Sequence, residues 1–369
     1  MYNTSYKKGK KIIVCKEVYS KMNSNIQLLK NILQSPSVSG KEYLSLDIFE
    51  KYLCDIASIK RDSLGNRYAI FTTKKPVKIL YEAHIDNVGY QVTYIDTNGF
   101  LFIRPVGGAD LMASIGSKVV VETKDGSYIN GVIGKKPIHL LLPEERKQMP
   151  SIEDVYVDCG LSVNEASCLI PIGGYVSYAP SIIELGNNLI SAVGLDDKTG
   201  IYCLSEALRT IYKNNPGAPI AAMAAVQEEI GCRGAQIGVA NIEPEIVLCV
   251  DVCFASDTPD VSPKKVGDIQ LGAGPVLSYN ADNHPDLLKL AEKLALENNI
   301  PFQKTAYLHA SGGTDTSRMQ IAQKGVKSLL ISIPCRYMHT PVEVCSIRDL
   351  ENTIHLLVLL SKESNYNIS

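Results

Sequence analysis

The spacing of apolar and polar positions changes twice along the chain. Residues 24–55 carry apolar residues at helical intervals, interrupted where Ser39 to Glu42 has the form of a capping box. The runs NRYAIFTT and VKILYEAH then predict strands. From about 89 to 187, short β-like runs alternate with glycine-rich turns, and only LPEERKQM suggests a helix. This stretch predicts a small β-rich domain.

After about residue 188, helices and strands alternate. Helices are predicted at LDDKTGIYCLSEALRTIYK, HPDLLKLAEKLALENN, TDTSRMQIAQKG and SIRDLENTIHLLVLLSKES, and strands at PIAAMAAVQ, EIVLCVDVC and VKSLLISIP. Such alternation is typical of a mostly parallel sheet. We therefore expect an α/β protein in which residues 1–88 and 188–369 form a three-layer αβα domain. Residues 89–187 would form an inserted β-rich domain, PDZ-like or barrel-like.

Composition narrows the class of protein. Hydrophobic residues make up 45% of the chain and charged residues 21%, which is ordinary for a globular protein with a large core. A net charge of −2 gives no electrostatic case for binding nucleic acid or an anionic membrane. No apolar run approaches the ~18–20 residues that span a bilayer.

The N-terminal stretch is basic, but its apolar run IIVC is shorter than the roughly 7–15 residues of a secretory signal. We expect an exposed tail, with a nuclear-type or surface-binding signal as the alternative. The ten cysteines lack paired metal-finger spacing, and several lie in apolar runs such as VLCVDVCFA. They are expected to be buried, reduced thiols of a cytoplasmic protein.

Potential metal ligands follow several predicted strands. In open α/β sheets, sites form outside the carboxyl ends of the strands. Each residue alone has a structural alternative, such as a helix cap, a turn residue or a hydrogen-bonded histidine. Their common placement favours one site instead. The residues are His84, Asp86, Glu228, Glu229, Asp251 and His339, together with Asp196 and Asp197 at a helix start.

A two-metal hydrolase explains this set. Histidine and carboxylate ligands suit zinc or a similar divalent ion. Two ions roughly 3.5–4 Å apart need a shared carboxylate, and a further carboxylate must stay off the metals as general base. The adjacent Glu228 and Glu229 can divide these roles, because neighbouring side chains of a strand point to different sides. In His84-x-Asp86, the aspartate can orient the histidine.

Seven motifs in this order resemble those of the tetrahedral aminopeptidase family, di-metal peptidases that include bacterial glutamyl aminopeptidase. The resemblance covers about residues 20–360. The motifs are AHIDNVG, GVIGKKPIHLLLPEERK, GLDDKTG, VQEEIGCRGA, DVCFASDTP, SGGTDTSRM and ISIPCRYMHTPVE.

The resemblance implies a metal-binding role for five residues. His84 would bind one ion, and Asp251 would complete its shell. Glu229 would bind the second ion, and His339 would complete that shell. Asp196 would bridge both. The ions would be zinc or cobalt, with manganese as a further option.

The resemblance implies further roles off the metals. Glu228 would be the general base, and Asp86 would orient His84. The family's cis peptide bond would join Asp196 to Asp197. The glycine-rich motif implies substrate binding by Gly313, Thr314 and Asp315.

Several residues depart from the family pattern or have no implied role. Asn87 stands where many relatives have glutamate, outside the ligand set. His309 precedes the substrate loop and is either structural or in contact with substrate. His139 has no metal role. Cys232 and Cys335 are expected to be packing residues, with oxidation or inhibitory zinc binding as the alternative.

The resemblance implies a cytoplasmic metal-dependent aminopeptidase that removes N-terminal residues from short peptides. Its insert would form dimers, and six dimers would build a hollow tetrahedral dodecamer. One alternative is a di-metal N-deacylase or carboxypeptidase-type hydrolase; another is a non-catalytic peptide-binding assembly protein. A glycosidase is disfavoured, because it needs two opposed carboxylates without metals.

Overall fold

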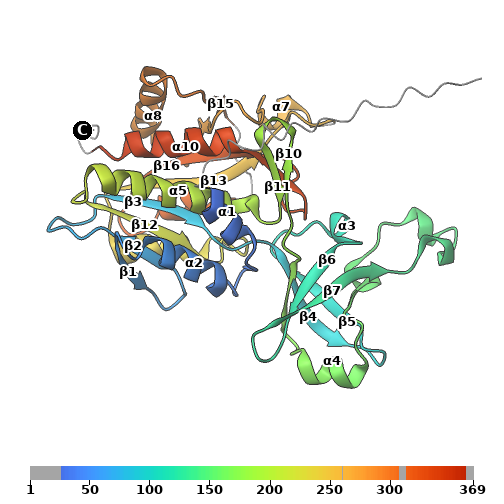
Figure 1. Ribbon diagram of the computed structural model, residues 1–369. Coiled ribbons are helices and arrows are strands. Elements are labelled where there is room, and N and C mark those ends of the chain that lie inside the picture. Colours follow the sequence, from blue (N-terminus) through green and yellow to red (C-terminus); the bar gives the residue numbers. More distant parts are fainter. Residues whose placement is uncertain (1–25, 260, 307–312, 363–369) are drawn as a thin grey trace, which may run out of the picture.

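The computed structural model describes residues 26–259, 261–306 and 313–362, so the predicted N-terminal tail lies outside the described residues. It consists of a mixed sheet covered by helices and a smaller β-barrel beside it (Figure 1). The predicted α/β architecture with an inserted β-rich unit is confirmed, and the insert takes the barrel form. Within the described ranges, no helix is long and apolar enough to cross a membrane.

The main sheet has eight strands, and its centre is parallel. Strands β12, β3, β13 and β16 run in the same direction, whereas β2 and β14 pair antiparallel to their central neighbours. All six residues of β3 are buried, as expected for a strand covered on both faces. The sheet order is β1 (Ser58–Arg61), β2 (Arg67–Ile70), β12 (Ile220–Ala225), β3 (Ile79–His84), β13 (Ile246–Phe254), β16 (Lys327–Cys335), β14 (Val276–Ser278) and β15 (Gln303–Thr305).

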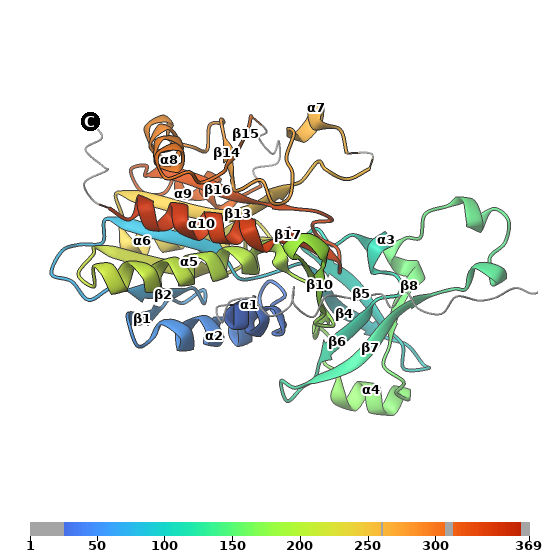
Figure 2. The ribbon, with the colours of Figure 1, turned by 45° about the horizontal axis from the view of Figure 1, so that its top comes forward.

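Helices cover both faces of this sheet (Figure 2). Because side chains alternate along a strand, Tyr81 and Ala83 of β3 enter one core and Leu80 enters the other. On the first face lie α1 (Ile26–Leu33), α2 (Tyr43–Leu53), α5 (Leu195–Asn214), α8 (Pro285–Glu297) and α10 (Ile347–Leu360). On the second lie α6 (Arg233–Ile242) and α9 (Asp315–Met319).

The insert is a closed antiparallel barrel with its own core, which includes Val92, Ile103 and Val121. Helices α3 (Leu111–Ser114) and α4 (Val163–Leu169) accompany it. The barrel order is β4 (Gly89–Ile95), β5 (Leu101–Val106), β8 (Val155–Asp158), β7 (Tyr128–Lys135), β6 (Lys118–Glu122) and β9 (Tyr175–Tyr178).

A third, three-stranded sheet follows the barrel. Its central strand β11 (Leu189–Ala192) pairs with β10 (Ile182–Leu185) and with β17 (Glu343–Ser346). Ala192 lies opposite Glu343 in this register. The pairing brings the segment that enters α5 next to the segment between β16 and β17, and both segments carry site residues.

Four local predictions were wrong. In the insert no helix was expected besides LPEERKQM, yet α3 and α4 form there. The Ser39–Glu42 capping box does not form: Glu42 is the N-cap of α2 without a side-chain cap bond, and the Ser39 hydroxyl donates to Asp86 Oδ2 at 2.6 Å. The LPEERKQM stretch contains only a 3₁₀ turn at Glu145–Lys147. The helix predicted at TDTSRMQIAQKG ends at Met319. At Ser39 a tertiary contact overrode the local propensity.

Candidate active site

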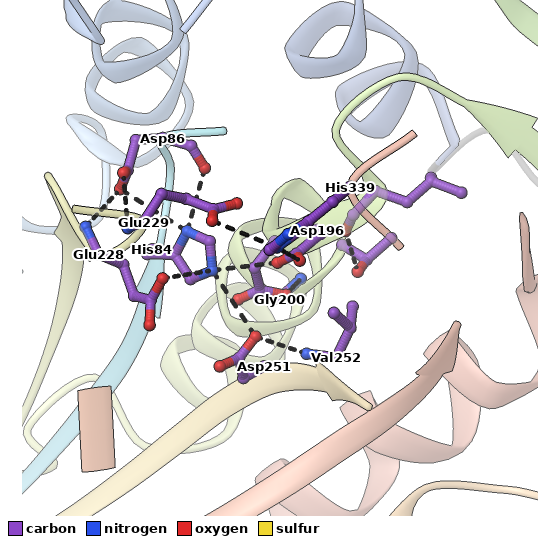
Figure 3. Close-up of polar contacts among 12 residues, drawn as sticks. His84, Asp86, Asp196, Gly200, Glu228, Glu229, Asp251, Val252 and His339 are labelled. Atoms are coloured by element: carbon purple, nitrogen blue, oxygen red, sulfur yellow. Dashed lines mark hydrogen bonds and ion pairs between the residues drawn. The ribbon is translucent and has the colours of Figure 1, made fainter. Parts of the chain in front are cut away.

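Residues at the carboxyl ends of the central strands meet at one edge of the sheet (Figure 3). His84 is the last residue of β3, and Glu228 follows the end of β12. His339 lies in the loop from β16 to β17. Asp251 lies within β13, which runs on to Phe254, and not at the strand end that its sequence pattern predicts.

Asp196 lies between the two histidines. Its Oδ1 is 3.1 Å from Nε2 of His84, and its Oδ2 is 3.3 Å from Nε2 of His339. The Asp196–Asp197 peptide bond is cis, as the family resemblance implies. A buried carboxylate between two imidazoles is suited to being shared by two metal ions.

The potential metal-ligand atoms around Asp196 fall into two groups, and within each group they lie within 4.8 Å of one another. Imidazole nitrogen and carboxylate oxygen are the donors that zinc and similar divalent ions prefer. The His84 group contains His84, Asp197 and Asp251, and the His339 group contains Asp196, Glu229 and His339.

Each of the two groups contains a buried carboxylate oxygen that has no hydrogen-bond partner among the described residues. These atoms are Oδ2 of Asp197 and Oε1 of Glu229. A buried carboxylate oxygen without a partner is costly, and a bound cation would provide the missing interaction. The residues present therefore fit two divalent ions.

Asp86 fixes the two glutamates as well as facing His84. Its Oδ1 accepts a hydrogen bond from the backbone N–H of Glu228 at 3.0 Å, and its Oδ2 accepts one from Glu229 at 3.2 Å. Nδ1 of His84 lies 3.0 Å from the carbonyl oxygen of Asp86 but 3.6 Å from its carboxylate. Asp86 thus contacts the imidazole mainly through its backbone, and its carboxylate holds the loop after β12.

Glu228 belongs to neither the His84 group nor the His339 group. Its Oε2 lies 4.0 Å from Nε2 of His84, and the Cys232 thiol donates a hydrogen bond to its Oε1 at 3.3 Å. Burial raises the pKa of Glu228 well above its ordinary value, whereas the charge of His84 opposes the rise. Glu228 lies beside the potential metal ligands and is oriented by the Cys232 thiol, so its carboxylate can accept a proton from a group bound at the site.

Asp315 lies within 4.8 Å of Glu228 and Cys232 and is only 2% exposed. Burial and the neighbouring charge of Glu82 raise the pKa of Asp315 well above its ordinary value. Neither carboxylate oxygen of Asp315 has a hydrogen-bond partner among the described residues. Gly313 and Thr314, which precede Asp315 in the chain, line a cavity together with Glu228 and Cys232.

The side chains of the His339 group shift one another's pKa values. Burial and the negative charge of Asp196 raise the pKa of Glu229 to about 7. Burial would lower the pKa of His339, but hydrogen bonds to Asp196 and Glu229 raise it to about 11. Burial would raise the pKa of Asp196, yet hydrogen bonds from both histidines lower it overall. The pKa values of these three residues therefore depend on one another, because the His339 imidazole contacts both carboxylates.

Sequence reasoning missed two residues. Asp197 was among the potential ligands but received no metal-binding role, yet its carboxylate joins the His84 group. Glu343 was not singled out, although its carboxylate accepts hydrogen bonds from the backbone N–H groups of Asp196 and His339. The doubled aspartate in LDDK and the glutamate of HTPVE were the available signals.

The other described residues that the sequence singled out belong to neither group. Asn87 is buried, and its Oδ1 accepts a hydrogen bond from Ser37. His139 is exposed in a 3₁₀ turn of the insert. Cys335 is buried in the core, and His309 lies outside the described residues.

A cavity of about 330 Å³ opens over the site. His84, Asp196, Glu228, Glu229, Asp251 and His339 all line it. Its volume is at the lower end of the range for small-molecule sites, roughly 300–1,000 Å³. The cavity therefore suits a small ligand or the end of a chain.

The chain is similar to known peptidases over most of its length. The sequence model of M42 glutamyl aminopeptidase matches residues 65–356. The lysyl aminopeptidase of Pyrococcus furiosus is 36% identical over 345 residues, which cover 91% of this chain and 96% of that protein.

Two solved structures share the fold. The TET aminopeptidase of the marine archaeon Thaumarchaeota archaeon SCGC AB-539-E09 superposes with a TM-score of 0.86 at 30% identity, covering 92% of this chain and 96% of that one. The Pyrococcus horikoshii TET1 peptidase, which can assemble into a tetrahedron or a large octahedral shell, gives 0.81 at 30% identity. That match covers 92% of this chain and all of the other.

Proposed function

This chain belongs to the M42 glutamyl aminopeptidase family and is an aminopeptidase, and from this premise we propose that it removes N-terminal residues from short peptides with Glu228 as general base. Members of the family are metallopeptidases. The observation that carries the proposal is Asp196 between His84 and His339, with Glu228 beside them but outside both ligand groups.

The chain would hold two divalent ions, zinc or cobalt most readily and manganese as a further option. One ion would be held by the His84 group and one by the His339 group, with Asp196 shared. When bound, such ions act as Lewis acids and lower the pKa of water.

Glu228 would take the proton of the attacking water and pass it to the leaving amine. The carboxylate of Asp86 keeps Glu228 in place by accepting a hydrogen bond from the backbone N–H of Glu228. The Cys232 thiol orients Oε1 of Glu228. In the absence of cations, burial raises the pKa of Glu228. Nearby positive charge favours the ionised form, so an occupied site would return this carboxylate to the form that accepts a proton.

A short substrate follows from the size of the cavity. About 330 Å³ accommodates the end of a peptide but not a folded protein surface. Gly313 and Thr314 line the wall of the cavity and are proposed to contact the substrate, with Asp315 buried behind them.

We also propose that the insert forms a dimer contact and that dimers assemble into a tetrahedral dodecamer. The loop between β7 and β8 exposes large apolar side chains that a monomer would leave in water, namely Ile138, Leu140, Leu142 and Met149. The assembly of the Pyrococcus horikoshii relative into a tetrahedron supports this proposal. The nine described cysteines are free of disulfides, which supports a cytoplasmic location. The expectation that the cysteines are buried is wrong for Cys54 and Cys168, which are exposed.

Chelation followed by restoration of single metals tests the activity. The metal-free protein would be supplied with zinc, cobalt or manganese and assayed on short peptides with different first residues. Each peptide would be present with a free and with an acetylated N-terminus. We expect metal-dependent release of the first residue from free N-termini only.

Equal cleavage of acetylated peptides would favour an N-deacylase or another hydrolase. Release that persists after complete metal removal would contradict the metallopeptidase mechanism.

A further inference from the structure

Glu343 is the first residue of β17 and is only 2% exposed. Its Oε1 accepts a hydrogen bond from the backbone N–H of His339 at 2.8 Å, and its Oε2 accepts one from the backbone N–H of Asp196 at 3.2 Å. Glu343 itself belongs to neither ligand group. One buried carboxylate therefore connects the backbones of two residues of the His339 group.

These two residues come from segments that are distant in sequence. Asp196 lies at the start of α5, where its backbone angles are non-helical, and His339 lies in the β16–β17 loop with a φ of 65°. The β11–β17 pairing, with Ala192 opposite Glu343, brings the segments together but does not bond either ligand residue. Their separation thus depends on contacts such as those of Glu343.

The His84 group is built differently. His84 and Asp251 lie in β3 and β13, which pair directly in the main sheet. The sheet fixes the backbones of these two residues, whereas Asp197, the third member of the group, follows Asp196 at the start of α5. In the His339 group, Glu229 is held by Asp86, and the other two residues are held by Glu343. The two groups therefore differ in what positions them.

We propose that Glu343 is a positioning residue that contributes more to the metal affinity of the His339 group than to that of the His84 group. The inference rests on the proposed two-metal function. Glutamine at this position keeps the size but has one acceptor oxygen and one NH₂ group. The NH₂ group would face a backbone N–H, so one hydrogen bond would be lost and a buried donor left unpaired.

Asp349 provides a matched control. Its Oδ1 and Oδ2 accept hydrogen bonds from the backbone N–H groups of Gly274 and Gly272, each at 2.7 Å. Asp349 is fully buried but lies outside both ligand groups and the cavity lining. Asp349→Asn therefore makes the same chemical change to the same kind of carboxylate, away from the metal groups.

The experiment compares full-length wild type, Glu343→Gln and Asp349→Asn. The zinc content of each protein is measured after dialysis against limiting zinc. The metal-free proteins are then titrated with cobalt, and the absorption spectrum is followed. Together these measurements give the affinity for each of the two ions. Because contacts that orient metal ligands typically contribute 10- to 100-fold in affinity, we expect Glu343→Gln to weaken one of the two ions by about that factor. Asp349→Asn should bind both ions as wild type does.

His339→Ala and His84→Ala identify the weakened ion. The cobalt spectrum of Glu343→Gln at one equivalent should match that of His339→Ala, which retains the His84 group. If Glu343→Gln does not fold, Glu343→Asp keeps both acceptor oxygens on a shorter side chain and should show the same selective weakening to a smaller degree.

Unchanged binding of both ions by the folded variant, or equal weakening of both, would overturn the inference. These outcomes are distinct from failure of the proposed function, which would appear as a wild type that binds no pair of ions or releases no N-terminal residue.

Discussion

Nδ1 of His339 lies 3.2 Å from the carbonyl oxygen of Gly108, in the segment that follows β5 of the insert. A histidine that binds a metal through one ring nitrogen commonly donates its other N–H to a carbonyl group, which fixes the tautomer. The backbone N–H of Asp110 also donates to the carbonyl oxygen of His339 at 3.2 Å. The insert therefore forms part of the wall of the site.

Gly108→Ala should displace the His339 ring. An added Cβ would lie 2.9 Å from Nδ1 and 3.2 Å from Cε1 of that ring, which is closer than ordinary contact. Because a shift of about 1 Å in a catalytic group can cost about 100-fold, we expect kcat/KM to fall by roughly 10- to 100-fold. Gly186→Ala is the control, since its added Cβ meets nothing within 4 Å. Unchanged kinetics of Gly108→Ala would show that the ring has room to move.

Glu228→Gln should lower kcat by about 10²- to 10⁴-fold, the usual contribution of a general base. Glutamine cannot accept the proton, but Glu228 belongs to neither metal group, so zinc content should stay at the wild-type value. Glu229→Gln, the neighbouring change, should instead reduce zinc content because Glu229 belongs to the His339 group. Near-normal turnover by zinc-loaded Glu228→Gln would refute its assignment as the base.

The stability of the metal-free protein should fall as the pH rises from about 5 to about 8. Burial raises the pKa of Glu229 to about 7 and that of Glu343 to about 8, from an ordinary value of 4.5. Over this range the folded chain keeps protons that the unfolded chain has released, so rising pH favours unfolding. The raised pKa of His339 acts in the same direction above its ordinary 6.5.

Zinc should reverse part of this loss, because metal ligands bind in their deprotonated forms and affinity rises with pH. The difference in Tm between zinc-loaded and metal-free protein should therefore widen between about pH 5 and about pH 8. Thermal unfolding at several pH values measures it. A constant difference would mean that the acids of the site do not titrate in this range.

Leu142→Glu should weaken self-association. Leu142 is 65% exposed in the β7–β8 loop, where charge would be buried if the insert forms the dimer contact. Light scattering should show a smaller particle, while a variant that still folds keeps its metal groups intact. Leu296→Glu, at a 67% exposed position on α8, is the control and should keep the wild-type mass. An unchanged mass for Leu142→Glu would exclude this loop from the interface.

Much of the architecture could be predicted because its signals are local. The apolar run ILYEAH is fully buried in β3, and the short β-like runs after residue 89 form the barrel. Local signals failed at Ser39, whose hydroxyl donates to Asp86 instead of capping α2. That partner becomes available only after folding brings the two segments together.

The sequence alone determined the αβα architecture with its inserted β domain and indicated which histidines and carboxylates follow the predicted strands. It did so because strand period and residue chemistry are properties of short segments. Only the tertiary structure decided that Asp197 joins His84, that the carboxylate of Asp86 holds the two glutamates, and that Glu343 connects Asp196 to His339. These contacts join segments far apart in the chain, and their partners are set by strand pairing and burial, which no local pattern specifies.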